Sequence, residues 1–168
     1  MAILVCLSGC TGAQPPLSTD LKMSDSSAER QLIGGFYQPE QNWRWVARRF
    51  AVVFPPPSGS EQSGATLQLR FFISKTTIGR LGPMTLTAIV GNTSLAPETF
   101  TRFGNFTYHA EVPPTALQSN RVVPVVFTFD KALSPGETDG RELSVVVTEV
   151  SLRASPIGGR RSLGAAPS

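Results

Sequence analysis

The stretch TLQLRFFI, Thr66–Ile73, decides the fold class because its apolar side chains recur with a period of two. Gln68 and Arg70 fall on the side opposite to the apolar set, which consists of Leu67, Leu69, Phe71 and Ile73. Alternation of this kind is typical of a β-strand with one face in a core and the other in water. The stretch therefore predicts a half-buried strand.

Further runs of the same character follow this stretch and are separated by turn-forming residues. Alternating or valine-rich segments occupy residues 84–90, 106–112, 123–129 and 142–152. Gly91-Asn92 predicts a two-residue hairpin, since both residue types tolerate positive φ. No amphipathic helix longer than about ten residues is evident. About seven or eight short strands with regular breaks predict an all-β, antiparallel sandwich or barrel.

Composition excludes several classes of function. A chain of 168 residues suits one domain with tails. The net charge is only +3 and the arginines are scattered, so no nucleic-acid partner is expected. The two cysteines, Cys6 and Cys10, lie at the N-terminus, and His109 is the single histidine. The body of the chain therefore offers no disulfide framework and no zinc site.

No motif for an enzyme or a cofactor is evident in the sequence. No nucleophile elbow, phosphate-binding glycine loop or readable pair of catalytic carboxylates is present. Four carboxylates crowd one loop without a calcium-loop signature, namely Asp130, Glu137, Asp139 and Glu142. We therefore expect a non-catalytic protein without a metal or cofactor.

The N-terminus predicts a membrane anchor. An apolar run, Ala2–Leu7, leads into Leu7–Cys10, LSGC, which resembles the lipobox of bacterial lipoproteins. The resemblance implies a lipid on Cys10 and a location in the bacterial cell envelope, on the periplasmic or the extracellular face. A secretory signal has a basic start and an apolar core of about 7–15 residues. No Lys or Arg precedes Cys10, and Ala2–Leu7 supplies only six core residues. Residues 1–10 are therefore interpreted as a truncated signal segment; the alternative is an apolar start with no such role.

The rest of the chain divides by composition into three parts. Residues 11–33 are rich in Ser, Pro, Asp and Gln and lack a sustained period, which predicts a flexible tether. Residues 34–153 carry the strand pattern and are expected to form the β-sandwich domain. Residues 154–168 contain few core-forming side chains and are expected to form a disordered tail.

The segment GGFYQPEQNWRWVARRFAVVF, residues 34–54, concentrates aromatic and cationic side chains ahead of an apolar run. Together with the closing segment, residues 112–152, it resembles galactose-binding-like β-sandwich domains of the kind appended to bacterial glycosyltransferases and methyltransferases. The resemblance implies a jelly-roll sandwich without catalytic residues. Its matching positions are Gly35, Tyr37, Glu40, Arg44, Trp45, Asp130, Pro135, Asp139, Arg141 and Leu143.

Two interpretations of this segment remain open. In the first, sugar rings stack on three aromatic side chains while polar groups bond hydroxyls, and the site comprises Tyr37, Glu40, Trp43, Arg44, Trp45 and Arg141. In the second, the same residues form a structural latch that ties the first strand to the last through arginine–carboxylate pairs. The partner is accordingly a glycan or an envelope protein. The function is a binding or scaffolding module, carbohydrate-binding in the first case and protein-interacting in the second.

Overall fold

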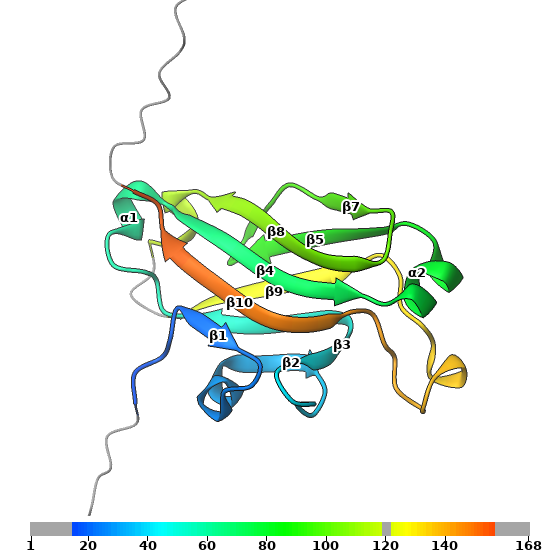
Figure 1. Ribbon diagram of the computed structural model, residues 1–168. Helices are drawn as coiled ribbons and strands as arrows, with labels where there is room; N and C mark the ends of the chain where they lie inside the picture. Colours follow the sequence, from blue (N-terminus) through cyan, green and yellow to red (C-terminus); the bar gives the residue numbers. More distant parts are fainter. Residues whose placement is uncertain (1–14, 119–121, 157–168) are drawn as a thin grey trace, which may run out of the picture.

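The computed structural model describes residues 15–118 and 122–156, which form two antiparallel sheets packed face to face (Figure 1). Sheet A contains β1 (Asp20–Lys22), β10 (Val146–Ala154), β4 (Ala65–Ile73) and β8 (Gly104–Val112), in that order. Sheet B contains β2 (Leu32–Phe36), β3 (Arg44–Phe54), β9 (Val123–Phe129) and β5 (Met84–Val90), with β6 (Thr93–Ser94) and β7 (Glu98–Phe100) paired to β5.

The order of strands is that of a jelly-roll. The long strands alternate between the sheets, so that β4 in sheet A is followed by β5 in sheet B, and β8 in sheet A by β9 in sheet B. Every pairing is antiparallel, as expected for a sandwich of this type. The start of β3 also pairs with β10, at Trp45–Val146 and Arg44–Val147, which joins the sheets along one edge. The predicted all-β antiparallel sandwich is confirmed.

The connections contain only short helices wherever the structure describes them. They are α1 (Ser60–Ser63), α2 (Lys75–Leu81) and three 3₁₀ turns at Ser26–Gln31, Pro114–Ala116 and Pro135–Glu137. The two α-helices lie at opposite ends of the sandwich (Figure 1). In the described part of the chain, no helix has the length and apolar character that crossing a membrane requires.

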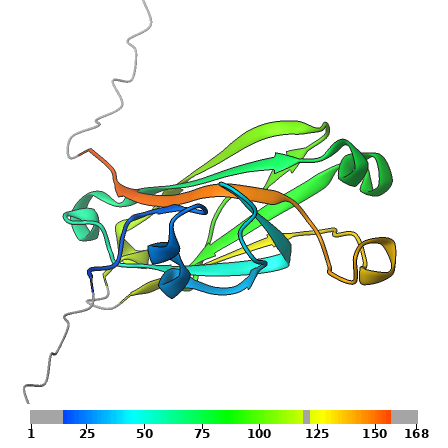
Figure 2. The same cartoon turned by 60° about the horizontal axis from the view of Figure 1, so that its bottom comes forward.

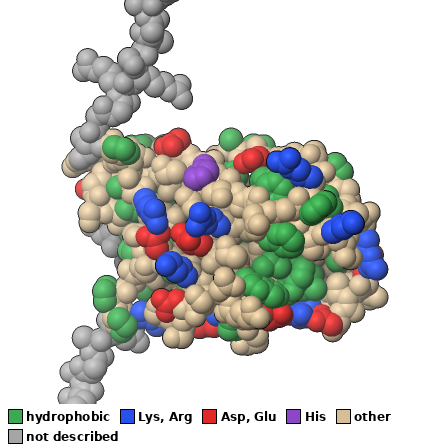
Figure 3. Space-filling model, viewed as in Figure 1, with side chains coloured by type: hydrophobic (Ala, Val, Ile, Leu, Met, Phe, Trp, Pro, Cys, Tyr) green, Lys and Arg blue, Asp and Glu red, His purple; other side chains and the backbone are tan. Residues whose placement is uncertain are grey.

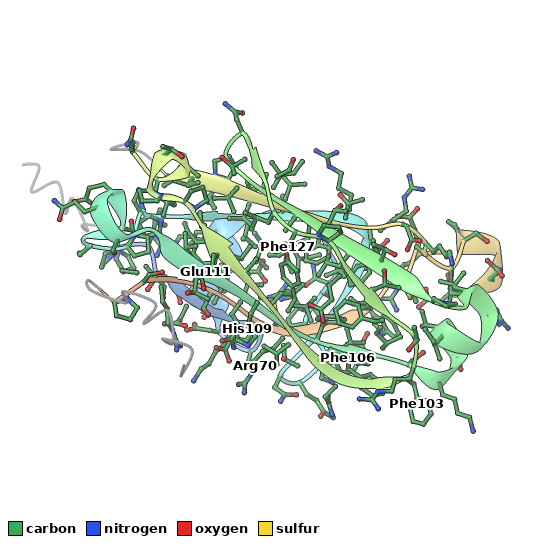
Figure 4. The ribbon with its side chains drawn as sticks, turned by 90° about the horizontal axis from the view of Figure 1, so that it is seen from above. Arg70, Phe103, Phe106, His109, Glu111 and Phe127 are labelled. Atoms are coloured by element: carbon green, nitrogen blue, oxygen red, sulfur yellow. The ribbon has the colours of Figure 1, made fainter. Side chains whose placement is uncertain are left out.

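The core follows from the period-two pattern. Burial in β4 alternates along its length, with Leu67, Leu69, Phe71 and Ile73 all buried. Within sheet B, Phe50 stacks on Phe127 with ring centroids 5.1 Å apart. Across the layers, the ring of Phe71 in β4 meets that of Phe129 in β9 edge-on, with centroids 5.5 Å apart. Figure 4 shows Phe127 between the two sheets. The predicted hairpin is also present, since Val90 pairs with Thr93 across Gly91-Asn92.

The predicted flexible tether is wrong from Ser18 onward. β1 pairs with β10, and the side chains of Leu21, Met23 and Ala28 are buried in the core. The side chain of Gln31 accepts from the Ser18 amide and donates to the Ser18 and Val53 carbonyls, as a neighbouring strand would. This segment lies against the bottom of the sandwich, beside β10 and β3 (Figure 2). Its few apolar residues are spaced without a period, so pattern alone does not reveal them.

The C-terminal boundary also lies slightly beyond residue 153. Ala154 is the last residue of β10, and the Ser155 amide donates to the Gly64 carbonyl at 3.0 Å. The rest of the predicted tail lies outside the described residues. The lipobox-like segment and Cys10 also lie outside them.

Candidate functional site

The two tryptophans stand on the outer face of the sandwich. Arg44 and Val46 point inward with Phe50, so Trp43 and Trp45 point to the opposite side of the chain. Both indoles are half-buried. Their ring centroids are 6.3 Å apart, and the ring planes meet at 86°. The alternation of β3 therefore separates the tryptophans from the buried phenylalanines that follow them.

A row of outer-face residues crosses four strands beside these indoles. Trp45 pairs with Val146, Val146 with Phe72 and Phe72 with Asn105. Val146 is only 8% exposed although it faces outward, because the aromatic residues on either side cover it. The row creates an aromatic surface at one part of sheet A. Figure 3 shows hydrophobic side chains gathered at the lower right of this face, and a group of charged side chains at its centre left.

Two adjoining hollows on this surface form one groove, here called the outer groove. The first has a volume of about 390 Å³ and is lined by Trp43, Trp45, Phe72, Asn105, Val146 and Thr148. The second has a volume of about 280 Å³ and is lined by Arg70, Phe71, Asn105, Phe106, Thr107 and Thr148. Asn105 and Thr148 belong to both linings, so the hollows lie side by side. The first hollow falls in the range of small-molecule sites, about 300–1,000 Å³, and the second lies just below that range.

The two ends of the outer groove differ in chemistry. The end at the tryptophans contains no charged side chain. The other end supplies amide and hydroxyl groups and one cation, Arg70, whose Nη1 lies 3.4 Å from Oε2 of Glu149. Arg70 and His109 project from the outer side of sheet A (Figure 4). Flat apolar rings beside neutral hydrogen-bonding groups suit a ligand with apolar faces and polar edges.

Arg44, predicted as part of the same site, lies on the other side of β3 and holds the N-terminal segment. Its side chain is 4% exposed, and its Nη2 lies 2.5 Å from Oε1 of Glu29. Its Nε donates to the carbonyl of Met23 at 3.4 Å, and its Nη1 to that of Tyr37 at 3.3 Å. Arg44 therefore stabilises the fold beneath the tryptophans and has no access to the outer groove.

Tyr37, Glu40 and Arg141 come together in a second cluster. The guanidinium carbon of Arg141 lies 5.1 Å from the centroid of the Tyr37 ring, and its Nη1 lies 3.8 Å from Oε1 of Glu40. Asp139 accepts two hydrogen bonds from Nε of Arg141 and one from Nη2, which lowers the pKa of that carboxyl. The Tyr37 hydroxyl donates to the Glu142 carbonyl at 2.9 Å. These contacts tie the β2–β3 connection to the loop that precedes β10.

Turn geometry links this cluster to the tryptophans. The amide of Glu40 donates to the carbonyl of Trp43 at 2.8 Å, which closes a tight turn. Gln41 within the turn has a φ of +60°, which is uncommon for a residue other than glycine. The predicted site residues thus divide into a latch (Tyr37, Glu40 and Arg141), an inward anchor (Arg44) and two outward indoles.

The prediction missed several residues of the outer groove and one partner of Arg44. Phe72 carries a readable signal, because it places an aromatic group at a position where the alternation of β4 calls for a polar one. Asn105, Thr107 and Thr148 are ordinary outward residues of strands and carry no such signal. Glu29 lies within the segment interpreted as a tether.

The carboxylates that crowd the loop before β10 take separate partners. Asp130 accepts from the amide of Thr85, Glu142 accepts from the amide of Arg48, and Glu137 accepts from Ser134. The bonds from Ser134 lower the pKa of Glu137. Among residues 15–118 and 122–156, no three His, Cys, Asp or Glu side chains are grouped so as to hold a metal ion.

The chain is similar to known proteins in structure only. No protein-family model matches the chain, and no curated protein matches it. Its structure is similar to carbohydrate-binding module CBM36 in complex with calcium and xylotriose, at 11% identity, a TM-score of 0.44 and coverage of 79% of this chain and 98% of that one. It is also similar to the family 35 carbohydrate-binding module from Clostridium thermocellum, at 10% identity, a TM-score of 0.34 and coverage of 82% and 90%.

A third similar structure belongs to a longer protein. It is the Podospora anserina GH26-CBM35 β-(1,4)-mannanase, at 9% identity and a TM-score of 0.45. The match covers 82% of this chain and 27% of that chain.

Proposed function

We propose that this chain is a non-catalytic lipoprotein of the bacterial cell envelope whose β-sandwich binds carbohydrate in the outer groove. One observation carries the proposal. Trp43 and Trp45 share an outward-facing hollow with Phe72, in a position where the fold has no need of three aromatic side chains. An aromatic patch on the outer face of a sheet loses contact with water only when something covers it.

The chemistry of the groove favours a sugar as the covering group. The C–H face of a pyranose ring is apolar and flat, and its hydroxyl groups point outward from the edge. The indole rings offer matching faces at one end of the groove. Asn105 and Thr107 offer donors and acceptors at the other end. Because the indoles are half-buried, their orientation is set before the ligand arrives, which lowers the entropic cost of binding.

The binding test uses soluble neutral oligosaccharides with the purified chain. Trp43→Ala and Trp45→Ala should each weaken binding at least about tenfold, equivalent to about 1.4 kcal/mol. Phe103→Ala is the matched control, since Phe103 is 55% exposed and does not line the groove. Isothermal titration gives the affinities, and circular dichroism checks the fold. Unchanged affinity in both tryptophan variants contradicts the proposal.

The location follows from the lipobox-like LSGC at Leu7–Cys10. A lipid on Cys10 would hold the domain at a membrane surface, and stable anchoring takes more than one acyl chain. The test expresses the protein in a bacterial host and labels the cells with an alkyne fatty acid. Cys10→Ser should abolish labelling, whereas Cys6→Ser should leave it unchanged. Equal labelling of the two variants contradicts the location.

A second candidate, a protein-interaction module without a small-molecule ligand, is favoured by the outer face of sheet B. Ile33 and Ile89 are 58% and 37% exposed there, and Ile89 pairs with Val126, which in turn pairs with Ala51. Ile33→Asp combined with Ile89→Asp should abolish crosslinking to an envelope protein and leave glycan binding intact. Crosslinking that survives both changes removes this candidate.

A further inference from the structure

The angle between the two indoles limits the physical form of a ligand. Trp43 and Trp45 meet at 86°, so their faces cannot both lie on one plane. A flat crystalline surface needs coplanar rings, each stacked on a parallel row of sugars. Here, a ligand that stacks on one ring meets only the edge of the other. The aromatic end of the groove therefore fits a single polysaccharide chain that is free to turn between the two rings, and it does not fit a crystalline surface.

The length of the groove favours several sugar units. The row Trp45, Val146, Phe72 and Asn105 spans β3, β10, β4 and β8. Adjacent strands are about 4.8 Å apart, so the row is about 14 Å long, which corresponds to roughly one sugar ring for each strand interval. A monosaccharide would fill only one interval of this row.

The elements that supply the lining residues favour binding to the interior of a polysaccharide over binding to its end. Every lining residue except Trp43 belongs to a strand of sheet A or to the β3 segment paired with it. A site that recognises the end of a polysaccharide needs protein groups that block further sugar units. Such groups usually come from loops. Trp43 is the one lining residue outside a strand.

The charge of the groove favours a neutral glycan. Arg70 is the single ionisable group in the lining, and Glu149 lies 3.4 Å from it. The carboxylate offsets the positive charge that an acidic polysaccharide would need. Amide and hydroxyl groups on Asn105, Thr107 and Thr148 pair equally well with uncharged hydroxyls.

We infer that the outer groove binds the interior of a single, soluble, uncharged polysaccharide chain, with the indoles holding one unit and the Asn105–Thr107 end holding the last. The inference depends on the proposed carbohydrate-binding function and defines its ligand class. The indole end supplies most of the binding energy, and the polar end sets the number of units that are bound.

The test titrates the protein with neutral β-linked gluco-, xylo- and manno-oligosaccharides, from the monosaccharide to the hexasaccharide. In at least one series, affinity should rise at least about tenfold from the monosaccharide to the trisaccharide and then level off, as about three strand intervals become filled. Methylation of the terminal hydroxyls of the hexasaccharide should leave its affinity unchanged. Crystalline cellulose should not retain the protein, and polygalacturonate should bind more weakly than the neutral chain.

Two variants test the separate contributions of the two ends of the groove to binding. Asn105→Ala combined with Thr107→Ala should remove the gain from the disaccharide to the trisaccharide while the affinity for shorter sugars stays the same. Trp45→Ala should weaken the binding of every length. Thr87→Ala, on the outer face of sheet B, is the control for a hydroxyl removed elsewhere and should change nothing.

The outcomes separate the inference from the proposed function. Retention on crystalline cellulose, affinity that levels off at the monosaccharide, loss of binding after terminal methylation, or preference for polygalacturonate overturns the inference and leaves carbohydrate binding in place. Absence of binding to every soluble, crystalline and acidic glycan overturns both.

Discussion

Arg44 and Glu29 form an ion pair at the boundary of the core, with Nη2 and Oε1 2.5 Å apart. The arginine is almost fully buried, whereas the Glu29 side chain is 53% exposed. The pair joins the 3₁₀ turn of the N-terminal segment to β3 directly behind the tryptophans. The N-terminal segment therefore belongs to the folded sandwich, and it supports the start of β3, where Trp43 and Trp45 lie.

Removing the acidic partner should destabilise the protein because it leaves a buried guanidinium with carbonyl acceptors alone. We expect Glu29→Ala to lower the free energy of unfolding by about 2 kcal/mol, as for the loss of a hydrogen bond to a charged group. Glu149→Ala, which removes the partner of the exposed Arg70, is the matched control and should cost less than about 1 kcal/mol. Urea unfolding measures both. Equal losses would show that the burial of Arg44 makes no difference.

Gly35 should tolerate no side chain. Its φ is +79°, and an added Cβ would lie 2.1 Å from the carbonyl oxygen of Arg49 and 2.6 Å from the Cα of Phe50. Gly35→Ala should therefore lower the free energy of unfolding by about 3 kcal/mol or more. An added Cβ at the neighbouring Gly34 meets nothing within 4 Å, so Gly34→Ala should stay within about 1 kcal/mol of the parent. Similar thermal midpoints for the two variants would contradict the close contact.

A chain that begins at Gly34 should be much less stable than one that begins at Pro15. The shorter chain loses the buried side chains of Leu21 and Met23, each worth about 1.5–3 kcal/mol. It also leaves Arg44 without its partner. The total is a large part of the stability of a typical domain, about 5–15 kcal/mol. Denaturant unfolding of the two chains is the measurement, and coincident curves would show that the segment is dispensable.

Tyr108 should make the fold sensitive to alkaline pH. Burial, with a smaller effect from Glu98, raises the pKa of its hydroxyl, which donates to the Ala96 carbonyl at 2.8 Å. The unfolded chain releases the proton near pH 10, before the folded protein does. The stabilising contribution is therefore complete below about pH 10 and declines as pH rises through the raised value. Tyr108→Phe should lack this decline in unfolding titrations, and parallel profiles would contradict the assignment.

The sequence predicts the architecture well and the groove poorly, for physical reasons. Alternation in segments such as 66–73 specifies which side chains meet the core, and that information is local. The groove depends on register, since Phe72 and Asn105 meet Trp45 only through the pairing of four strands from distant parts of the chain. Register is a property of the assembled sheet, which a single segment does not encode.

The N-terminal segment and Arg44 illustrate a second limit. Leu21 and Met23 are isolated apolar residues among polar ones, a pattern that also describes a tether. Their burial depends on an opening at the edge between β10 and β3 that exists only in the folded protein. The neighbours of Arg44 in the sequence indicate a binding site or a latch, whereas its partner Glu29 lies in the segment that composition predicts to be a tether.

The amide of Leu152 donates to the carbonyl of Thr19 at 2.8 Å, which extends the pairing of the first strand, β1, with the last strand, β10. The pairing is antiparallel, so a force that pulls the two ends of the domain apart would load these hydrogen bonds one after another rather than all at once. Mechanical unfolding from the ends would therefore begin with the separation of β1 from β10, and it would release the N-terminal segment before the sheets come apart.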